Sequence, residues 1–343
     1  MTTVWFCLLA FMIAMYVVLD GFDLGVGALH RILGRDDSER DESIELIGPV
    51  WDGNEVWLIA AGGVLFLGFP VAYAAAFSGF YFGLIIVLWL LVGRGLGIEL
   101  RHQSDNPLWR TACDTVFWLC SAALAFMFGV ALGNVVRGVP LGPDGYFRAP
   151  LFSLLNWYAL LIGLFGLVVL VAHGANFLGW RATAPLGERA RRVARRLWWA
   201  ELLLVAALAY PTYDVRNEMF TNFGDHPWRL VCPALALAAL VAQLVFQRTG
   251  RFGRAFLASS LFIVGMLATM AAGLYPNILP AHDDRPFGLT IHNAASGHHA
   301  LAVGLRWWSL GIVLALSYFF IAYRYLFRHE PGPSAAGEGW GSE

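Results

Sequence analysis

Long apolar stretches recur along the whole chain and are separated by short polar segments. Measured against the roughly 20 residues that a helix needs to cross a bilayer, they predict nine transmembrane helices. The alternating pattern of membrane β-strands is absent, so the pattern indicates an all-α polytopic membrane protein and excludes a β-barrel. The predicted spans are residues 4–29, 50–68, 72–98, 112–134, 153–179, 197–214, 230–247, 255–275 and 299–326.

The boundary between the second and third spans is the least marked. Gly68-Phe69-Pro70 is the only interruption there. One long kinked hairpin is therefore the alternative to two separate helices at this point.

Two loop sequences suggest an internal repeat. Residues 133–140 and 273–280 each follow an apolar span and pass from glycine to proline. They fit two four-helix bundles plus one peripheral helix, although chance glycine- and proline-rich loops explain the likeness equally well. We expect a single integral membrane domain over residues 1–330 and a disordered cytoplasmic tail over 331–343. Within the domain, helices 1–4 cover about 4–134, helices 5–8 about 153–275 and helix 9 about 299–326.

Composition supports the membrane assignment. Hydrophobic residues make up 58% of the chain and charged residues only 14%, against about 25% charged residues in soluble domains. The formal net charge of −1 offers no attraction to nucleic acid. The first apolar segment is too long for the roughly 7–15-residue core of a signal peptide and has no basic stretch before it, so we expect it to remain as a helix.

The arginines predict an orientation. Lysine is absent, and seventeen arginines fall in the loops after helices 1, 3, 5 and 7 or in the C-terminal region, against six on the opposite side. Because cytoplasmic loops carry an excess of positive charge, the N-terminus is predicted outside and the C-terminus in the cytoplasm. An odd number of helices agrees with this, because it places the two termini on opposite sides of the membrane.

Acidic residues gather where the first four helices reach the predicted cytoplasmic side. Asp20 and Asp23 share one face near the end of the first span, and Asp52 and Glu55 begin the second. An ionised side chain near hydrocarbon is costly unless it faces protein or water, so such acids indicate a functional site by default. Carboxylates close together release protons at different pH values, as a proton relay requires. The set comprises Asp20, Asp23, Asp52, Glu55, Glu99 and Asp114, with Ser121 two helical turns beyond Asp114.

Structural roles are the alternatives for several of these acids. Asp52 and Asp114 fall in predicted first helical turns, where a carboxylate caps free N–H groups. Glu99 and Arg101 could form an interfacial ion pair and nothing more. Capping does not explain Asp20 and Asp23, the acids of the first span, because a helix C-terminus disfavours anions. A functional or inter-helical polar role is expected for them.

Ligands for a metal or a haem are scarce. The sequence shows no phosphate-binding loop, dinucleotide-binding glycine pattern or zinc-ligand spacing. Only His173 falls within a predicted span, whereas the other eight histidines, His30 among them, are assigned to loops or to the tail. A lone intramembrane histidine is more often a hydrogen-bonded packing residue than a haem ligand, and both interpretations stay open for His173.

Several stretches of the chain resemble subunit II of the cytochrome bd-type quinol oxidases. They are DGFDLGVG at 20–27, GPVWDGNEVWL at 48–58, the region 62–81 that ends in YAAAFSGFY, GN followed by GVP within 133–140, and LTI-x-NAAS at 289–296. The resemblance runs from the first helix to the last. It implies two four-helix bundles plus a peripheral helix, in a complex that oxidises quinol and reduces oxygen to water.

The resemblance also implies partners and cofactors. In the family, this subunit pairs with a larger haem-bearing subunit I and lacks haem ligands, so haems b and d are expected in the partner. No metal or catalytic residue is then expected in this chain, and the isolated chain should be inactive. A small single-helix third subunit, membrane lipid and quinone are further expected partners, in the inner membrane of a bacterial cell.

Site residues follow from the same resemblance. Glu55 stands where the family often has glutamine, which leaves the order of a relay open. Some members hold a structural quinone in this subunit, and Trp51 and Arg110 are the candidate headgroup neighbours. The positions that match the family's proposed cytoplasmic proton pathway are Asp20 or Asp23, Asp52, Asp114 and Ser121.

We therefore expect a subunit of a membrane quinol:oxygen oxidoreductase, a terminal oxidase of the aerobic respiratory chain. Its expected role is to support subunit I and to conduct cytoplasmic protons towards the oxygen-reducing site. A proton-coupled secondary transporter is the alternative from another class, and it would need a midplane binding site between broken helices. A haem bound through His173 is a third hypothesis.

Overall fold

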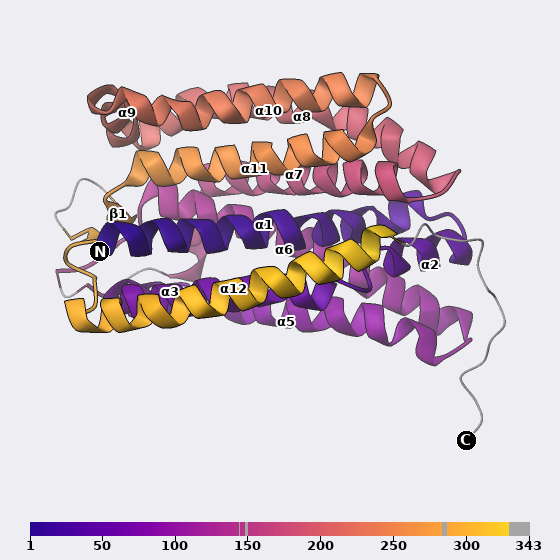
Figure 1. Ribbon diagram of the computed structural model, residues 1–343, viewed down its shortest axis with the longest axis horizontal. Helices are drawn as coiled ribbons and strands as arrows, with labels where there is room; N and C mark the ends of the chain where they lie inside the picture. Colours follow the sequence, from indigo (N-terminus) through magenta and orange to yellow (C-terminus); the bar gives the residue numbers. More distant parts are fainter. Residues whose placement is uncertain (144, 148–149, 283–286, 329–343) are drawn as a thin grey trace.

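The computed structural model is a bundle of long helices that run roughly along one direction (Figure 1). It describes residues 1–143, 145–147, 150–282 and 287–328. The longer helices are α1 (Thr2–Leu33), α3 (Trp51–Gly68), α5 (Tyr81–Glu99), α6 (Pro107–Arg137), α7 (Trp157–Arg181), α8 (Leu186–Val215), α10 (Val231–Arg248), α11 (Phe252–Leu274) and α12 (His298–Arg328). The shorter elements are α2 (Asp37–Glu45), α4 (Pro70–Gly79), α9 (Asn217–Asp225), the 3₁₀ turns η1 (Arg101–Gln103), η2 (Leu151–Leu154) and η3 (Pro227–Leu230), and the antiparallel strands β1 (Asn277–Leu279) and β2 (Leu289–Thr290).

The all-α class is confirmed, and each predicted span overlaps a long helical segment. Within the described ranges, seven helices are long and apolar enough to cross a membrane, and α3 and α8 fall outside this group. The second and third spans are separate, because α3 ends at Gly68 and α4 begins with Pro70, whose fixed φ suits a first helical turn. The predicted third span comprises α4 and α5, with a break at Phe80. The predicted tail at 331–343 lies outside the described residues.

Two helices begin earlier than the sequence pattern predicts. α6 starts at Pro107 and is capped by the side chain of Asn106. α8 starts at Leu186, so the arginine-rich stretch that was assigned to a loop forms its first turns. This stretch is amphipathic, with Ala190 and Ala194 buried and most of its arginines exposed, and hydropathy alone does not detect such a helix.

Two groups of helices lie on either side of α1 and α6. In Figure 1, α8, α9 and α10 lie along one edge, α11 and α7 come next, and α3, α5 and α12 lie along the opposite edge. α1 packs against α3, α6 and α7, and α6 also packs against α5 and α7. α2 lies at the end of the bundle where α1 finishes, which we call the α2 end.

Glycines allow α1 and α7 to approach closely. A Cβ atom added to Gly25 would lie 2.8 Å from the nitrogen and 2.9 Å from the Cα atom of Gly174, so the two backbones are in contact there. In a membrane, small residues let helix backbones come together and gain van der Waals contact. The DGFDLGVG stretch therefore has a packing role in addition to its acids.

We expect Gly25→Ala to destabilise the protein by about 1–3 kcal/mol, because the added methyl group meets the backbone of α7 rather than a movable side chain. The thermal unfolding midpoint of the purified protein in detergent measures the change. Gly62→Ala is the matched control, since nothing lies within 4 Å of a Cβ atom at Gly62. Equal losses in the two variants would contradict the close contact at Gly25.

Candidate functional site

One face of α1 carries the predicted acids deep into the bundle. Asp20, Asp23, Gly27 and His30 recur at intervals of three or four residues, so they lie along one side of the helix. The three polar side chains among them are at most 1% exposed. At 1.5 Å per residue, the stripe extends about 15 Å from His30 to Asp20. We call this stripe, together with Ser121 opposite Gly27, the α1 ladder.

Arg94 of α5 neutralises the inner end of the α1 ladder. Its guanidinium donates two hydrogen bonds to the Asp20 carboxylate, at 2.8 and 2.6 Å, and both side chains are fully buried. Glu55 of α3 lies 3.4 Å from the same guanidinium. Arg94 lies within the predicted span 72–98 but was counted among the seventeen arginines of the cytoplasmic side, and this is wrong, because α5 turns it into the bundle.

Asp23, one turn further along α1, has only one of its carboxylate oxygens occupied. Asn54 of α3 donates a hydrogen bond of 2.7 Å to Asp23 Oδ2 and another of 3.1 Å to the backbone oxygen of Leu19. The hydroxyl of Tyr323, in α12, donates to Asn54 Oδ1 at 3.1 Å. Asp23 Oδ1 is buried without a hydrogen-bond partner among the described residues. Asp23 is thus held in place by an amide and not by a cation.

Ser121 of α6 fills the space left by the missing side chain of Gly27. A Cβ atom at Gly27 would collide with the Ser121 side chain. Ser121 Oγ is buried and, within the described ranges, accepts or donates no hydrogen bond. Buried polar atoms of this kind are where proteins hold bridging water or an exchanging proton. The middle of the α1 ladder therefore offers two such atoms, on Ser121 and Asp23.

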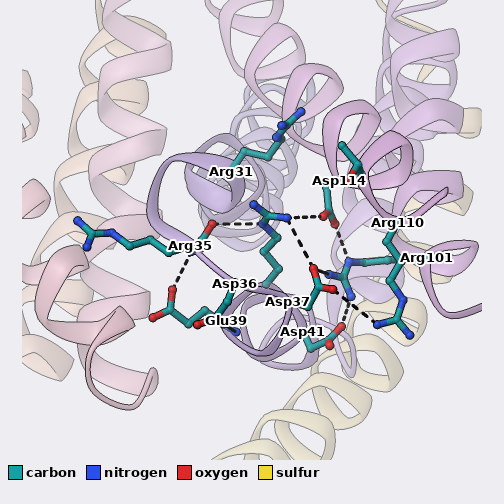
Figure 2. Close-up of polar contacts among 12 residues, drawn as sticks. Arg31, Arg35, Asp36, Asp37, Glu39, Asp41, Arg101, Arg110 and Asp114 are labelled. Carbon is teal, nitrogen blue, oxygen red and sulfur yellow. Dashed lines mark hydrogen bonds and ion pairs between the residues drawn. The ribbon is translucent and has the colours of Figure 1, made fainter. Parts of the chain in front are cut away.

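Asp114 of α6 closes the α1 ladder at the α2 end, where it faces Arg101 (Figure 2). Its carboxylate lies 2.5 Å from Arg101 Nε and 3.3 Å from Arg40 Nη1. It also lies 2.9 Å from His30 Nε2, and His30 Nδ1 lies 2.8 Å from the hydroxyl of Ser43. A buried carboxylate is tolerated when charged hydrogen-bond donors surround it in this way. His30 therefore joins Asp114 to the stripe on α1.

A charged network from α2, η1 and the start of α6 surrounds Asp114 at the α2 end (Figure 2). Arg101 also contacts Asp41, and its Nη2 lies 3.6 Å from Asp37. Arg110 lies 2.8 Å from Asp105 and 3.9 Å from Asp37. This network places acids and arginines between the solvent and the buried carboxylate of Asp114.

Arg189 of α8 ties the two groups of helices together at the same end. Its Nε donates to the backbone oxygen of Leu33 at 3.0 Å, and its guanidinium also binds Glu39 of α2. The hydrogen bond from Arg189 holds the pKa of Glu39 below its usual value. The loop between α1 and α2 is therefore fixed by α8.

Two predicted acids lie on α3. Asp52 is exposed in the first helical turn, whereas Glu55 lies one turn further and is 24% exposed beside Arg94. The two candidate quinone neighbours have separate partners. The Trp51 ring centroid lies 5.9 Å from the Arg94 guanidinium carbon, and Arg110 belongs to the charged network described above.

Two structural alternatives from the sequence do not hold. Asp114 lies two turns inside α6, so it does not cap that helix. Glu99 is exposed, and Arg101 turns towards Asp114, so the expected Glu99–Arg101 pair is replaced by a buried one.

The histidines differ from their sequence assignment in one respect. His30 was assigned to a loop, but α1 continues to Leu33 and buries it. Its spacing of seven residues from Asp23 is the signal that could have placed it on the stripe. Both ring nitrogens of His173 make hydrogen bonds, one with Ser259 at 2.6 Å and one with the backbone oxygen of Val18 at 3.1 Å.

An apolar cavity of about 400 Å³ lies between α1, α6, α7 and α11. Its lining includes Phe128, Leu170 and Met266, and its polar groups include Tyr158 and Thr212, whose hydroxyls lie 3.0 Å apart. Among the described residues, no group of three or more His, Cys, Asp or Glu side chains is placed to hold a metal ion.

Known proteins resemble this chain over almost its whole length. The family model described as cytochrome bd terminal oxidase subunit II matches residues 1–326. The probable cytochrome oxidase subunit 2 of Haemophilus influenzae is 34% identical, covering 94% of this chain and 93% of the relative. The cytochrome bd-I ubiquinol oxidase subunit 2 of Escherichia coli K12 is 31% identical, with 94% and 92% covered. A chain in the structure of the bd oxidase from Geobacillus thermodenitrificans has the same fold, with a TM-score of 0.77 at 20% identity, over 96% of this chain and 99% of that one.

Proposed function

This chain belongs to the cytochrome bd terminal oxidase subunit II family, and we propose that within the oxidase it conducts protons from the cytoplasm along the α1 ladder. It is a multi-pass membrane subunit of a quinol oxidase, an oxidoreductase complex that contains a partner oxidase subunit. Family membership sets aside the alternative of a proton-coupled transporter.

The continuity of the α1 ladder carries this proposal. Polar groups follow one face of α1 from the charged network at the α2 end to Arg94, and they are enclosed by α3, α5, α6 and α12. A proton enters through His30 and Asp114, passes Ser121 and reaches Asp23. Ser121 Oγ and Asp23 Oδ1 have no direct partner among the described residues, so the route requires water bound between them to complete the hydrogen-bonded chain.

At the inner end of the α1 ladder, an ion pair fixes the charge of one acid, and a partly exposed acid lets the proton leave. Arg94 holds Asp20 as an anion through two hydrogen bonds, so Asp23, which faces only an amide, is the group that exchanges the proton. Glu55 shares Arg94 and is partly exposed, and Asp52 lies exposed one turn away on α3. Because Asp52 lies nearer the α2 end, where the protons enter, they leave through Glu55 towards the partner subunit.

The partner and the orientation complete the proposal. The partner is subunit I, which holds haems b and d, and a small single-helix third subunit completes the complex. The α2 end faces the cytoplasm of a bacterial cell, with the N-terminus outside. The arginines gathered at this end support that orientation, because positive charge is enriched in cytoplasmic loops.

A structural quinone is a second proposed ligand, and the apolar cavity is the place for it. The cavity can bury an apolar ring and tail, and the hydroxyls of Tyr158 and Thr212 can bind a quinone oxygen. Trp51 and Arg110 are occupied by Arg94 and by acids, which favours the cavity over them. Solvent extraction of the purified oxidase, with mass spectrometry, is expected to find a quinone that Thr212→Phe reduces.

Ser121→Ala tests the proton route. The variant is expected to slow quinol-driven oxygen consumption severalfold, and more so as the pH rises, because it removes the hydroxyl between His30 and Asp23 when protons are scarce. Ser260→Ala is the control, since in the described part of the chain that hydroxyl binds only the backbone oxygen of Phe256, outside the α1 ladder. If Ser121→Ala matched the wild type from acidic to alkaline pH, protons would have to take another path.

A further inference from the structure

A second buried acid lies in the other group of helices, away from the α1 ladder. Glu201, in the middle of α8, is 0% exposed. Its one hydrogen bond among the described residues comes from Gln243 Nε2 of α10, at 2.9 Å. Among the described residues no arginine or histidine forms an ion pair with it. An isolated carboxylate in such a place is very costly unless it is neutralised.

The helices packed against α8 offer no ionised partner to Glu201. α10 presents Gln243 and Gln247, both fully buried amides. α7 presents Asn176, which bonds to Gln247, and His173, which bonds to α11 and α1. A bound proton is therefore the simplest means of neutralising it.

The oxygen atoms of the pair point to the same conclusion. Glu201 Oε1 and Gln243 Oε1 are both buried and without a partner in the described part of the chain. An ionised carboxylate only accepts hydrogen bonds, so it would leave the Gln243 oxygen unsatisfied. A neutral carboxylic acid can donate its O–H to that oxygen while the amide N–H donates back, which satisfies both groups.

Further polar residues continue from this pair towards the α2 end, and we call Gln247, Asn176 and Arg195 the polar string. Gln247 lies one helical turn beyond Gln243 on α10, and its Nε2 donates to Asn176 Oδ1 at 2.9 Å. The exposed Arg195 donates to the backbone oxygen of Gln247 at 3.1 and 3.3 Å. In the other direction, the next buried residue on α8 is Leu208, beside the apolar cavity. Among the described residues, the hydrogen bonds of the polar string therefore lead towards the α2 end only.

We propose that Glu201 is a proton-binding site, in which a neutral carboxylic acid pairs with the carboxamide of Gln243 and exchanges its proton with the α2 end through Gln247. The site is separate from the α1 ladder and does not depend on the proposed proton route. Because the polar string leads only towards the α2 end, the site holds a proton and does not transfer it to another part of the protein. The neutral pair also holds α8 against α10.

Infrared spectroscopy of the intact oxidase in membranes tests this proposal. At neutral pH, a protonated buried carboxyl group gives a carbonyl stretching band that shifts slowly in D₂O. Glu201→Gln is expected to remove one such band, whereas Glu188→Gln, at an exposed acid on the same helix, is expected to keep it. Gln243→Leu retains the acid but removes its partner, so the band should shift and remain. This variant also serves if Glu201→Gln fails to assemble.

The outcomes separate the proposal from its competitors. The same protonated-carboxyl bands in the wild type and in Glu201→Gln at neutral pH would show an ionised Glu201 and overturn the proposal. A band that appears only after sodium is removed would overturn it in favour of a cation site. Oxygen consumption by Glu201→Gln is expected to stay within about twofold of the wild type. If the rate of oxygen consumption fell as much as it does when the α1 ladder is blocked, Glu201 would be part of a proton route across the protein. This would contradict a site that only holds a proton.

Discussion

Arg94→Leu is expected to destabilise the subunit by about 3–5 kcal/mol, because it leaves the buried carboxylate of Asp20 without either of its charged hydrogen bonds. Glu55 loses its nearest cation at the same time. The expected signs are a lower thermal unfolding midpoint and less of this chain co-purifying with its partner subunit. Arg306→Leu is the matched control, since that arginine is exposed on α12.

A double variant distinguishes the loss of the ion pair from a general loss of packing. Replacing both Arg94 and Asp20 with leucine removes the two charges together, and a buried pair exchanged for apolar side chains often keeps or gains stability. We expect the double variant to recover most of the unfolding midpoint that Arg94→Leu loses. Its rate of oxygen consumption should remain below that of the wild type. If the double variant were as unstable as Arg94→Leu, the pair could not be the cause of the first effect.

The sequence predicted the helices and the acids of α1 well, because both are local signals. Apolar stretches of about 20 residues mark a span without any knowledge of its neighbours. Asp20 and Asp23, three residues apart at a helix C-terminus, lack a local structural explanation, and their burial in the α1 ladder fits that expectation.

The partners of these acids could not be predicted, because they come from distant segments. Arg94 lies 74 residues from Asp20 and is adjacent to it only after α5 packs into the bundle. The rule that places arginines in cytoplasmic loops counts Arg94 like any other. Asn54, in the second predicted helix, binds Asp23, and Tyr323, in the last, binds Asn54, and nothing in either segment alone indicates this.

The α2 helix is a case in which a local signal was available. Asp36 followed by Glu39 has the spacing of a capping box, and the Asp36 carboxylate accepts a hydrogen bond from the Glu39 backbone N–H at 2.9 Å. The sequence analysis assigned this charged stretch to a loop, because only the apolar pattern was followed. The short helix matters because it brings Arg40 and Asp41 to the charged network around Asp114.

Asp23→Asn is expected to slow quinol-driven oxygen consumption about tenfold or more, equivalent to at least about 1.4 kcal/mol of activation free energy. Asparagine neither binds nor releases a proton, so the proposed route is interrupted between Ser121 and Glu55. The side-chain oxygen that accepts from Asn54 is kept, and the unfolding free energy should change by only about 1 kcal/mol.

Three variants show whether the loss belongs to proton transfer. Asp105→Asn is the control, because this acid is fully exposed and, among the described residues, binds only Arg110. Asp23→Glu restores an exchangeable carboxyl group, so it should recover part of the rate that Asp23→Asn loses. The haem spectrum of the complex should be the same in all three, since none alters the partner subunit. Full activity of Asp23→Asn at neutral and alkaline pH would exclude Asp23 from the route, and Asp20 would then be the exchanging acid in spite of its arginine.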